Sequence, residues 1–341
     1  MKIIKFNKKL KKILTMVCII SFMNISTSYA NIIENFNFKN ITIEDGLSQS
    51  TVKTIYQDIK GYIWVGTDKG LVELDKNLNL IKSYEDTIGE VEVYNIYDDL
   101  KGNLWVCTLG NGLFRINLND KSIKNYKNSR SASSILSNNI RDVISNSSGD
   151  SIYGIYKDDD NLLWLGTSEQ DVNIINEKEV KYLHTENSNL LSNTIIDITG
   201  YKNKVFIGTN NSLSVLIKDN ENYTITNYTE KEGLPSNKIT YLFVDSKGAL
   251  FIGTRNGLAI LDSNNKLIDI TYILDDIGIS DKFIGAIYED SKENYYIGCF
   301  LGGGLIKINP NTKKYKIYKN IDNDETSLSN DCIIFINEDL D

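Results

Sequence analysis

The 341-residue chain is almost without histidine, and His184 is the only one. A metal centre built on imidazole needs several histidines, and a Ser-His-Asp triad needs one beside its nucleophile. The chain also contains no P-loop, no GxSxG motif and no HExxH motif. We therefore expect no catalytic residues, no cofactor and no metal centre in this chain.

Cysteines are scarce as well. The three that follow residue 30 are Cys107, Cys299 and Cys332, and no CxxC spacing occurs. An odd number of widely spaced cysteines does not form a disulfide framework. We expect these thiols to be buried as small apolar side chains.

The first thirty residues lack the run of ~20 apolar residues that a membrane span needs. They begin with six lysines and no acid, continue with a mostly apolar stretch over 13–23, and end in Ser28-Tyr29-Ala30. This order is typical of a secretory signal peptide with small residues before the cleavage site. We therefore predict a signal peptide over 1–30 and a secreted or extracytoplasmic remainder. An uncleaved N-terminal anchor is the alternative.

Positive charge is outnumbered in that remainder. The whole chain has a net charge of −8, and setting the six N-terminal lysines aside leaves −14. Non-specific nucleic-acid binding needs a basic surface that displaces counterions from phosphates. We therefore expect no nucleic acid among the partners.

One pattern occurs six times: two short runs of alternating apolar and polar residues around a tight turn. "YIWVGTDKGLVELD" (62–75) is the first copy and "ALFIGTRNGLAILD" (249–262) is the fifth. The aligned aromatic residues are Trp64, Trp105, Trp164, Phe206, Phe251 and Tyr296. A period in the low forties built from strand-like segments is the signature of a β-propeller with four strands per blade. We expect these aromatics to form the core between blades.

Both ends of the repeat region hold incomplete blades. "FNFKNITI" (36–43) reads as a strand without a repeat of its own, and we expect it to complete the last blade. "LSNDCIIFINEDLD" (328–341) restarts the repeat, with Asp339 at the place of Asp58 in the first copy. We therefore predict an all-β propeller over 31–341, with six repeats and the start of a seventh. The complete protein is expected to be seven-bladed, so that this chain is a fragment of it.

Two stretches carry a resemblance to a known family. "EDGLSQSTVKTIYQDIKGYIWVGTDKGLVELD" (44–75) and "EGLPSNKITYLFVDSKGALFIGTRNGLAILD" (232–262) share a GLS or GLP loop, an acid-turn-glycine, an apolar strand ending in Gly-Thr and a turn before Gly-Leu. Over 36–341 the chain resembles the two-component regulator propeller family. Blades four to six differ by using Phe or Tyr in place of Trp.

The resemblance implies a function and a setting. Members of this family are extracytoplasmic sensor regions of transmembrane receptors whose output is a histidine kinase or a diguanylate cyclase. On this basis we expect a ligand-sensing domain that is membrane-tethered in the complete protein and self-associates there. The ligand is unidentified, and an oligosaccharide is one candidate. A protein-binding or adhesion propeller and a secreted propeller lyase are the alternatives.

Candidate ligand-binding residues are expected on the face where the loops that enter each first strand meet the turns between second and third strands. They are Asp68, Lys69, Asn111, Arg141, Glu169, Asn210, Arg255, Asn256 and Phe300. Two breaks of the repeat lie there, an insertion over 136–151 and the turn "CFLGGGL" (299–305). For most of these residues, satisfying the turn backbone is the alternative role. Paired acids such as Asp98-Asp99 fall on the opposite face, where we expect solvated turn residues.

Overall fold

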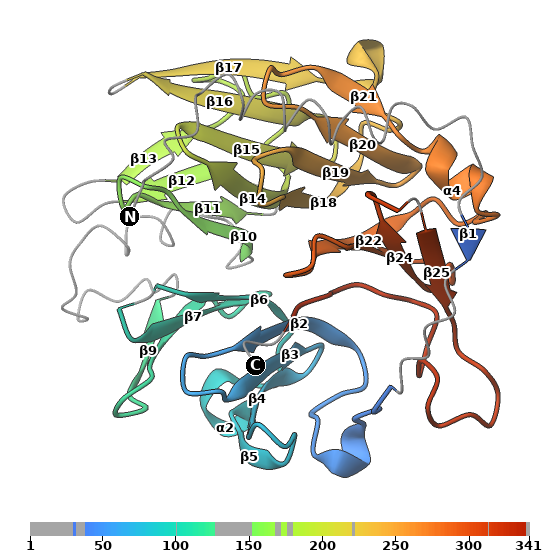
Figure 1. Cartoon of the computed structure of the whole chain (residues 1–341). Helices are drawn as coiled ribbons and strands as arrows, with labels where there is room; N and C mark the ends of the chain where they lie inside the picture. Colours follow the sequence, from blue (N-terminus) through green and yellow to red (C-terminus); the bar gives the residue numbers. More distant parts are fainter. Residues whose placement is uncertain are drawn as a thin grey trace, which may run out of the picture.

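The computed structural model describes residues 30–31, 38–99, 101–126, 152–167, 172–175, 180–219, 222–312 and 314–338. Six four-stranded antiparallel blades stand around a common centre (Figure 1). In each blade the strands pair in chain order, from an innermost first strand to an outermost fourth strand. The prediction of an all-β propeller with four strands per blade is therefore confirmed.

The strands of blades one to three are β2 (Val52–Gln57), β3 (Ile63–Thr67), β4 (Gly70–Leu74), β5 (Leu80–Ser83), β6 (Val93–Asp98), β7 (Asn103–Thr108), β8 (Leu113–Asn117), β9 (Ile123–Tyr126), β10 (Ile152–Lys157), β11 (Leu163–Thr167), β12 (Val172–Ile175) and β13 (Val180–Leu183). Those of blades four to six are β14 (Ile195–Tyr201), β15 (Lys204–Thr209), β16 (Leu213–Asp219), β17 (Asn222–Tyr228), β18 (Ile239–Val244), β19 (Leu250–Thr254), β20 (Gly257–Leu261), β21 (Leu267–Asp269), β22 (Ile284–Glu289), β23 (Tyr295–Cys299), β24 (Leu305–Asn309) and β25 (Lys314–Tyr318). The short helices are η1 (Ile43–Asp45), α2 (Glu85–Ile88), η2 (Glu230–Glu232) and α4 (Tyr272–Asp276). Within the described ranges, no helix has the length and apolar character needed to cross a membrane.

Each first strand carries a β-bulge near its start. The pairing with the second strand shifts at Val52/Thr54 in blade one and at Ile284/Ala286 in blade six, and the other four blades repeat the shift. A bulge bends a strand and increases its local twist. The repeated bulge therefore gives all six first strands, which lie nearest the common centre, a similar local twist.

The repeat residues explain how closely neighbouring blades pack. Trp64 is fully buried in one cluster with Leu104 and Val106 of blade two. Two residues later, a Cβ on Gly66 would lie 2.6 Å from Cγ1 of Val93. A large aromatic thus fills the space between sheets, and the glycine lets the backbones approach.

Five of the six repeat aromatics are at most 8% exposed: Trp64, Trp105, Trp164, Phe206 and Phe251. Tyr296 differs from the expectation and is only partly buried. It faces the side of blade six where the described neighbour is the segment 331–338, and its hydroxyl donates to Oδ2 of Asp290 at 3.2 Å. No complete blade covers its ring among the described residues.

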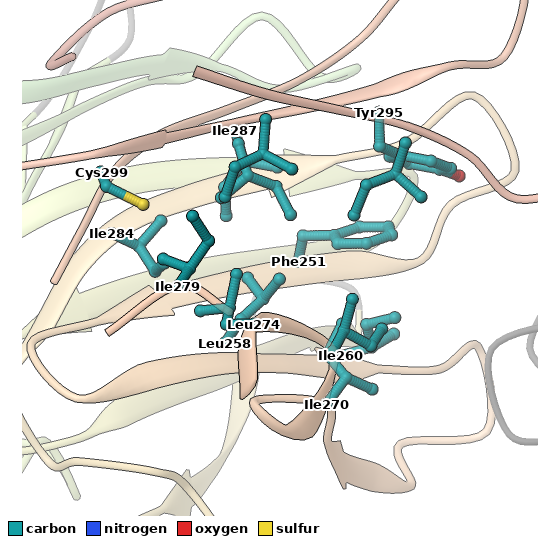
Figure 2. Packing of buried hydrophobic residues seen from close by; sticks show 14 of the residues in the cluster. Phe251, Leu258, Ile260, Ile270, Leu274, Ile279, Ile284, Ile287, Tyr295 and Cys299 are labelled. Atoms are coloured by element: carbon teal, nitrogen blue, oxygen red, sulfur yellow. The ribbon is translucent and has the colours of Figure 1, made fainter. Parts of the chain in front are cut away.

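A large core cluster lies between blades five and six (Figure 2). The rings of Phe251 and Tyr295 lie 4.7 Å apart between centroids, and Leu258 and Ile284 pack in the same cluster. Leu274 of α4 adds to it from the connection between the two blades. This packing joins blades five and six in one hydrophobic core.

The N-terminal segment completes blade six in a different way from the predicted strand over 36–43. β1 (Ala30–Asn31) pairs in parallel with β25 and gives blade six a fifth strand. The described part of 36–43 is irregular backbone that leads into η1. Phe38 donates its N–H to the carbonyl of Thr326 at 3.0 Å. The N-terminal segment is therefore joined to blade six by β1 and to the loop after it by backbone contacts.

Residues 331–338 pass beside blade six without regular strand pairing. A Cβ on Gly298 would lie 2.5 Å from Cγ2 of Ile333. In the preceding blade, a Cβ on Gly253 would lie 2.9 Å from Cγ2 of Ile284, which begins the next first strand. Ile333 therefore covers blade six as a first-strand residue covers the blade before it.

The other end of this segment repeats a second contact of the first strands. Oε2 of Glu338 accepts the N–H of Ser291 at 2.8 Å. Oε2 of Glu289, in β22, accepts the N–H of Ser246 at 2.7 Å in the same way. Glu338 and Ile333 thus contact blade six as residues of a first strand contact the preceding blade.

The acids of the turns between first and second strands agree only in part with the prediction of solvated turn residues. Asp159 and Asp160 are exposed, whereas Asp98 and Asp158 are buried. Asp158 is 5% exposed, and its Oδ2 accepts Nε1–H of Trp164 at 2.9 Å. Its Oδ1 accepts two backbone N–H groups of the turn. Asp98 is 8% exposed and accepts the hydroxyl of Tyr56 at 3.0 Å. These carboxylates hold the turn and orient core aromatics, so they are structural.

The thiols do not all follow the expectation of burial. Cys107 and Cys299 are buried, whereas Cys332 is exposed. Burial raises the pKa of the Cys299 thiol to about 12. Cys332 differs because its segment lies at the edge of blade six, where one side is open.

Candidate functional site

The two sets of loops expected on one face do lie together. The backbone N–H of Asp68, after the second strand of blade one, donates to the carbonyl of Thr51 before its first strand at 3.2 Å. In blade five, the N–H of Arg255 donates to the carbonyl of Lys238 at 3.0 Å, and blades two and six have the same bond. We call this end of the propeller the loop face.

Seven of the nine candidate residues belong to the described ranges: Asp68, Lys69, Asn111, Asn210, Arg255, Asn256 and Phe300. They stand on turns of the loop face in five different blades. Arg141 and Glu169, like the insertion over 136–151, lie outside the described residues. The candidates are therefore distributed around the face, and their individual contacts distinguish them.

Several candidates hold loops in place. Nδ2 of Asn111 donates to the carbonyl of Ile88 at 2.6 Å, and Oδ1 of Asn210 accepts the hydroxyl of Ser192 at 2.8 Å. Nζ of Lys69 lies 3.8 Å from a carboxylate oxygen of the following loop. These side chains have local partners that account for their presence.

Asp68 belongs to a row of side chains that extends along the first strands of blades one to three. Its Oδ1 lies 3.0 Å from Nζ of Lys53, which stands 5.5 Å from the centroid of the Tyr94 ring. Tyr94 in turn meets Tyr153 edge to face at 4.6 Å. Burial is the largest influence on the pKa of Lys53 and acts to lower it. The hydrogen bond to Asp68 and the charges of Tyr94, Asp68 and Glu92 together outweigh burial, so the pKa is raised. The ammonium group therefore stays charged beside the Tyr94 ring.

A threonine closes the turn between second and third strands in four blades. In blade five, the hydroxyl of Thr254 donates to the carbonyl of Gly257 at 2.9 Å and accepts the N–H of Asn256 at 3.2 Å. The threonines of blades one, two and four donate in the same way. The backbone of Asn256 is thus fixed, while its side chain is exposed.

Blade six closes the turn between its second and third strands differently, because Cys299 occupies the position of the threonine. Oδ2 of Asp281 accepts the N–H of Leu301 at 2.6 Å and that of Gly303 at 3.2 Å. Nζ of Lys319 donates to a carbonyl of the same turn at 3.1 Å. The longer glycine-rich turn is therefore anchored to the preceding loop.

This anchored turn presents an aromatic surface. The rings of Phe283 and Phe300 stack with centroids 4.5 Å apart and planes inclined by 24°. Cζ of Arg255, from blade five, lies 5.4 Å from the centroid of Phe283. Phe300 is 38% exposed and Leu301 is 71% exposed. We call Arg255, Phe283 and Phe300 the aromatic stack.

The structure thus brings together two candidates from different blades, Arg255 and Phe300, through a residue that the sequence reading missed. Phe283 precedes the first strand of blade six. The equivalent residues of other blades are Thr51, Glu92, Thr194 and Lys238. Phe283 could have been found in the sequence, because it is aromatic at a position that is polar in those blades.

A second unusual group lies on the first strand of blade four. Oδ2 of Asp197 accepts the N–H of Leu242 in blade five at 2.9 Å. Burial raises the pKa of the Asp197 carboxyl to about 6, against the opposing effect of two backbone N–H groups. Because its partner is the bulged strand of the next blade, Asp197 joins two blades.

Comparison with known proteins agrees with the repeat analysis. Residues 46–69, 146–169 and 233–256 match the model of the two component regulator propeller. Histidine kinase P4 of Formosa agariphila is 49% identical over 59 residues, which is 17% of this chain and 4% of that protein. The resemblance to two-component regulator propeller repeats is therefore confirmed.

Solved structures share the fold. The extracellular domains of two hybrid two component systems of B. thetaiotaomicron superpose with TM-scores of 0.72 and 0.68, at 20% and 19% identity. Each comparison covers 89% of this chain, but only 39% and 38% of those domains. A streptogramin B lyase gives a TM-score of 0.60 at 14% identity, over 85% of this chain and 88% of that one. Identities this low show the propeller fold alone.

Proposed function

We propose that this chain is the extracytoplasmic ligand-sensing propeller of a transmembrane receptor of the two-component type. The observation that carries the proposal is the combination of two-component regulator propeller repeats with a fold like that of two extracellular receptor domains. The basic and apolar N-terminal sequence, which is typical of a signal peptide, supports the same compartment. The chemistry of the output lies in other parts of the receptor.

The propeller of this receptor has seven blades. In support, the segment 331–338 repeats first-strand contacts with blade six, through Ile333 and Glu338. On its other side, Nδ2 of Asn337 donates to the carbonyl of Ile55 in blade one at 3.5 Å. A seventh blade built outward from this segment would cover the partly exposed ring of Tyr296.

The ligand binds the loop face at blades five and six. Arg255 and Phe300 are exposed there and contact a common ring, whereas Asn111 and Asn210 are occupied by loop contacts. Binding is transmitted if the ligand has different affinities for two arrangements of paired receptors, because only such a difference shifts their populations. Self-association through regions outside this chain is part of this proposal.

Of the alternatives, the lyase has the similar fold as its support. A lyase needs a placed acid and base, and the one imidazole of the chain accepts the N–H of Glu186 at 3.2 Å through Nδ1 of His184. That contact fits a residue that caps a turn. No specific contact favours the adhesion propeller over the sensor.

The proposal is tested by topology and by response. A fusion of residues 1–341 to a phosphatase that is active only outside the cytoplasm should be active, and removal of residues 2–12 should abolish this activity. In the complete receptor, the double variant Arg255→Ala/Phe300→Ala should lose the response to ligand at unchanged surface level. An active cytoplasmic reporter in the same fusion would refute the extracytoplasmic sensor.

A further inference from the structure

We infer that the aromatic stack takes a ligand that carries an anionic group, carboxylate or sulfate, on a ring with an apolar face. This inference rests on the proposed function and adds the chemical class of the ligand. It depends on two features of the loop face: an arginine that has no acidic partner among the described residues, and an open aromatic face.

The arginine is unusual for this chain. Only four of its 37 basic residues are arginines, and Arg255 alone stands on a turn of the loop face in the described residues. A guanidinium presents planar pairs of N–H donors that match a carboxylate or a sulfate, which an ammonium group does not. The described contact of the Arg255 side chain is with the ring of Phe283, and its exposed N–H groups remain available for an anion.

Lysine and acid side chains are mixed around the stack. Nζ of Lys319 donates to the carbonyl of Gly302 at 3.1 Å, and Lys282 is paired with Asp275 at 2.8 Å. The carboxylate of Asp281 accepts the N–H groups of Leu301 and Gly303 in the turn. The guanidinium of Arg255 is therefore the group of the stack that would hold an anion.

The ring of the ligand is expected on Phe300. Its ring is 38% exposed and is supported by stacking on Phe283. Apolar ring faces, including the C–H face of a sugar, pack favourably on such a surface. Arg255 and Phe300 both contact Phe283, at 5.4 and 4.5 Å, so one ligand can reach both residues.

The stack is also rigid before binding. The turn that carries Phe300 is held by Asp281 and Lys319, and Gly302 and Gly304 adopt φ of 101° and 81°, which suit glycine. A site that is ordered in advance loses little conformational entropy on binding.

The test compares matched probes by titration calorimetry on the full chain. Trigalacturonate, the neutral galactotriose and benzoate separate an acidic sugar from an aromatic acid. We expect one of the two anionic probes to bind at least about tenfold more tightly than galactotriose, a difference of about 1.4 kcal/mol. Arg255→Ala and Phe300→Ala should each weaken that probe by about tenfold or more, and Arg255→Lys by less, because it keeps the charge and loses the planar edge.

Two variants on the opposite end of the propeller serve as controls. Lys202→Ala removes a cation that stands 4.7 Å from the ring of Tyr201, and Ile59→Ala removes an apolar side chain that is 84% exposed. Both should leave probe binding unchanged. Equal binding of the neutral and anionic probes, failure of both anionic probes to bind, or insensitivity to Arg255→Ala would each overturn the inferred ligand class. The topology fusion is independent of these results, so the sensor proposal can survive that outcome.

Discussion

Asp281 and Leu301 are joined by a hydrogen bond of 2.6 Å from the backbone N–H to the carboxylate, across 20 positions of the chain. The bond takes over the role that a threonine hydroxyl has in the equivalent turns of blades one, two, four and five. It links the loop before Phe283 to the turn that carries Phe300. The shape of the aromatic stack therefore depends on one carboxylate.

Asp281→Ala should loosen this turn. Asp281 is a charged acceptor for an exposed N–H group, that of Leu301, and a partly buried one, that of Gly303, so its loss is expected to lower the free energy of unfolding by about 1–3 kcal/mol. Amide exchange at Leu301 and Gly303 should become faster. Asp275→Ala, which removes an exposed ion pair with Lys282, is the control and should change stability by less than about 1 kcal/mol. Unchanged exchange at both amides would show that the turn is held by other contacts.

Trp164→Ala and Tyr296→Ala should differ, although the two residues are equivalent in the repeat. Trp164 is fully buried and bonded to Asp158, so its loss is expected to cost about 3–5 kcal/mol. Tyr296 is partly buried, and its loss should cost about 1–2 kcal/mol. Chemical denaturation of this chain measures both. Equal costs would mean that Tyr296 is as well covered as Trp164.

The stability of the protein should depend on pH through Asp197. Its pKa is raised to about 6 in the folded state by burial, from an ordinary value of 3.8. The folded state therefore binds the proton more tightly, and stability is lost as the pH rises from about 4 to 6. Asp197→Asn cannot ionise and keeps an acceptor for Leu242. The free energy of unfolding of the variant, relative to that of the wild type, should therefore increase as the pH rises from 4 to 7.

A control with the opposite sign is available for this titration. The pKa of Asp75 is lowered by hydrogen bonds from Asn79, so the wild type gains stability as the pH rises through the acid range. Asp75→Asn should therefore become less stable relative to the wild type over this range. If the free energies of unfolding of Asp197→Asn and the wild type changed in parallel from pH 4 to 7, Asp197 would not be the group that causes the pH dependence.

Gly298→Ala should displace the segment 331–338. The new Cβ would lie 2.5 Å from Cγ2 of Ile333, too close for any side-chain contact. The N–H of Ile333, which donates to the carbonyl of Cys299 at 2.9 Å, should then exchange faster. Gly253→Ala crowds Ile284 in the same way, within complete blades, so it should lower overall stability and leave exchange at Ile333 unchanged. Retained protection at Ile333 in Gly298→Ala would contradict the described packing.

Thiol reactivity should separate the described cysteines. Cys332 is exposed, while Cys107 and Cys299 are buried, and burial raises the pKa of all three thiols. Because only Cys332 is accessible to solvent among them, an alkylating reagent should modify it in the native protein and the other two after denaturation. Peptide mapping by mass spectrometry assigns each site. Rapid native modification of Cys299 would show that the turn of blade six opens readily.

Most of the fold could be predicted from the sequence because the pattern of one blade is repeated six times. The aromatic at Trp64 and the glycine at Gly66 are needed wherever two sheets pack closely, so their period reveals the blades. The burial of Tyr296 could not be predicted in the same way, because it depends on what lies beyond blade six. The exposure of Asp98 and Asp158 was misjudged, because the sequence does not show that a carboxylate such as that of Asp158 accepts a buried indole N–H.

The candidate site was only partly accessible. Arg255 and Phe300 are exposed turn residues that the sequence identified, Phe300 within a break of the repeat and Arg255 within a regular turn. Phe283 contacts both of them across a blade boundary, which no local pattern encodes. Asn111 and Asn210 have the same residue type as a ligand contact would need, and only their observed partners identify them as loop supports.

The contacts between the N-terminal segment and blade six set an order for folding. Asn40 and Ser327, which are hydrogen-bonded, lie 287 positions apart, whereas the strands of each blade pair with near neighbours. Local pairs form quickly, and contacts between distant residues form late because a long loop must close first. β1 contributes only two residues to this closure. The contacts between the N-terminal segment and blade six are therefore expected to form after the individual blades.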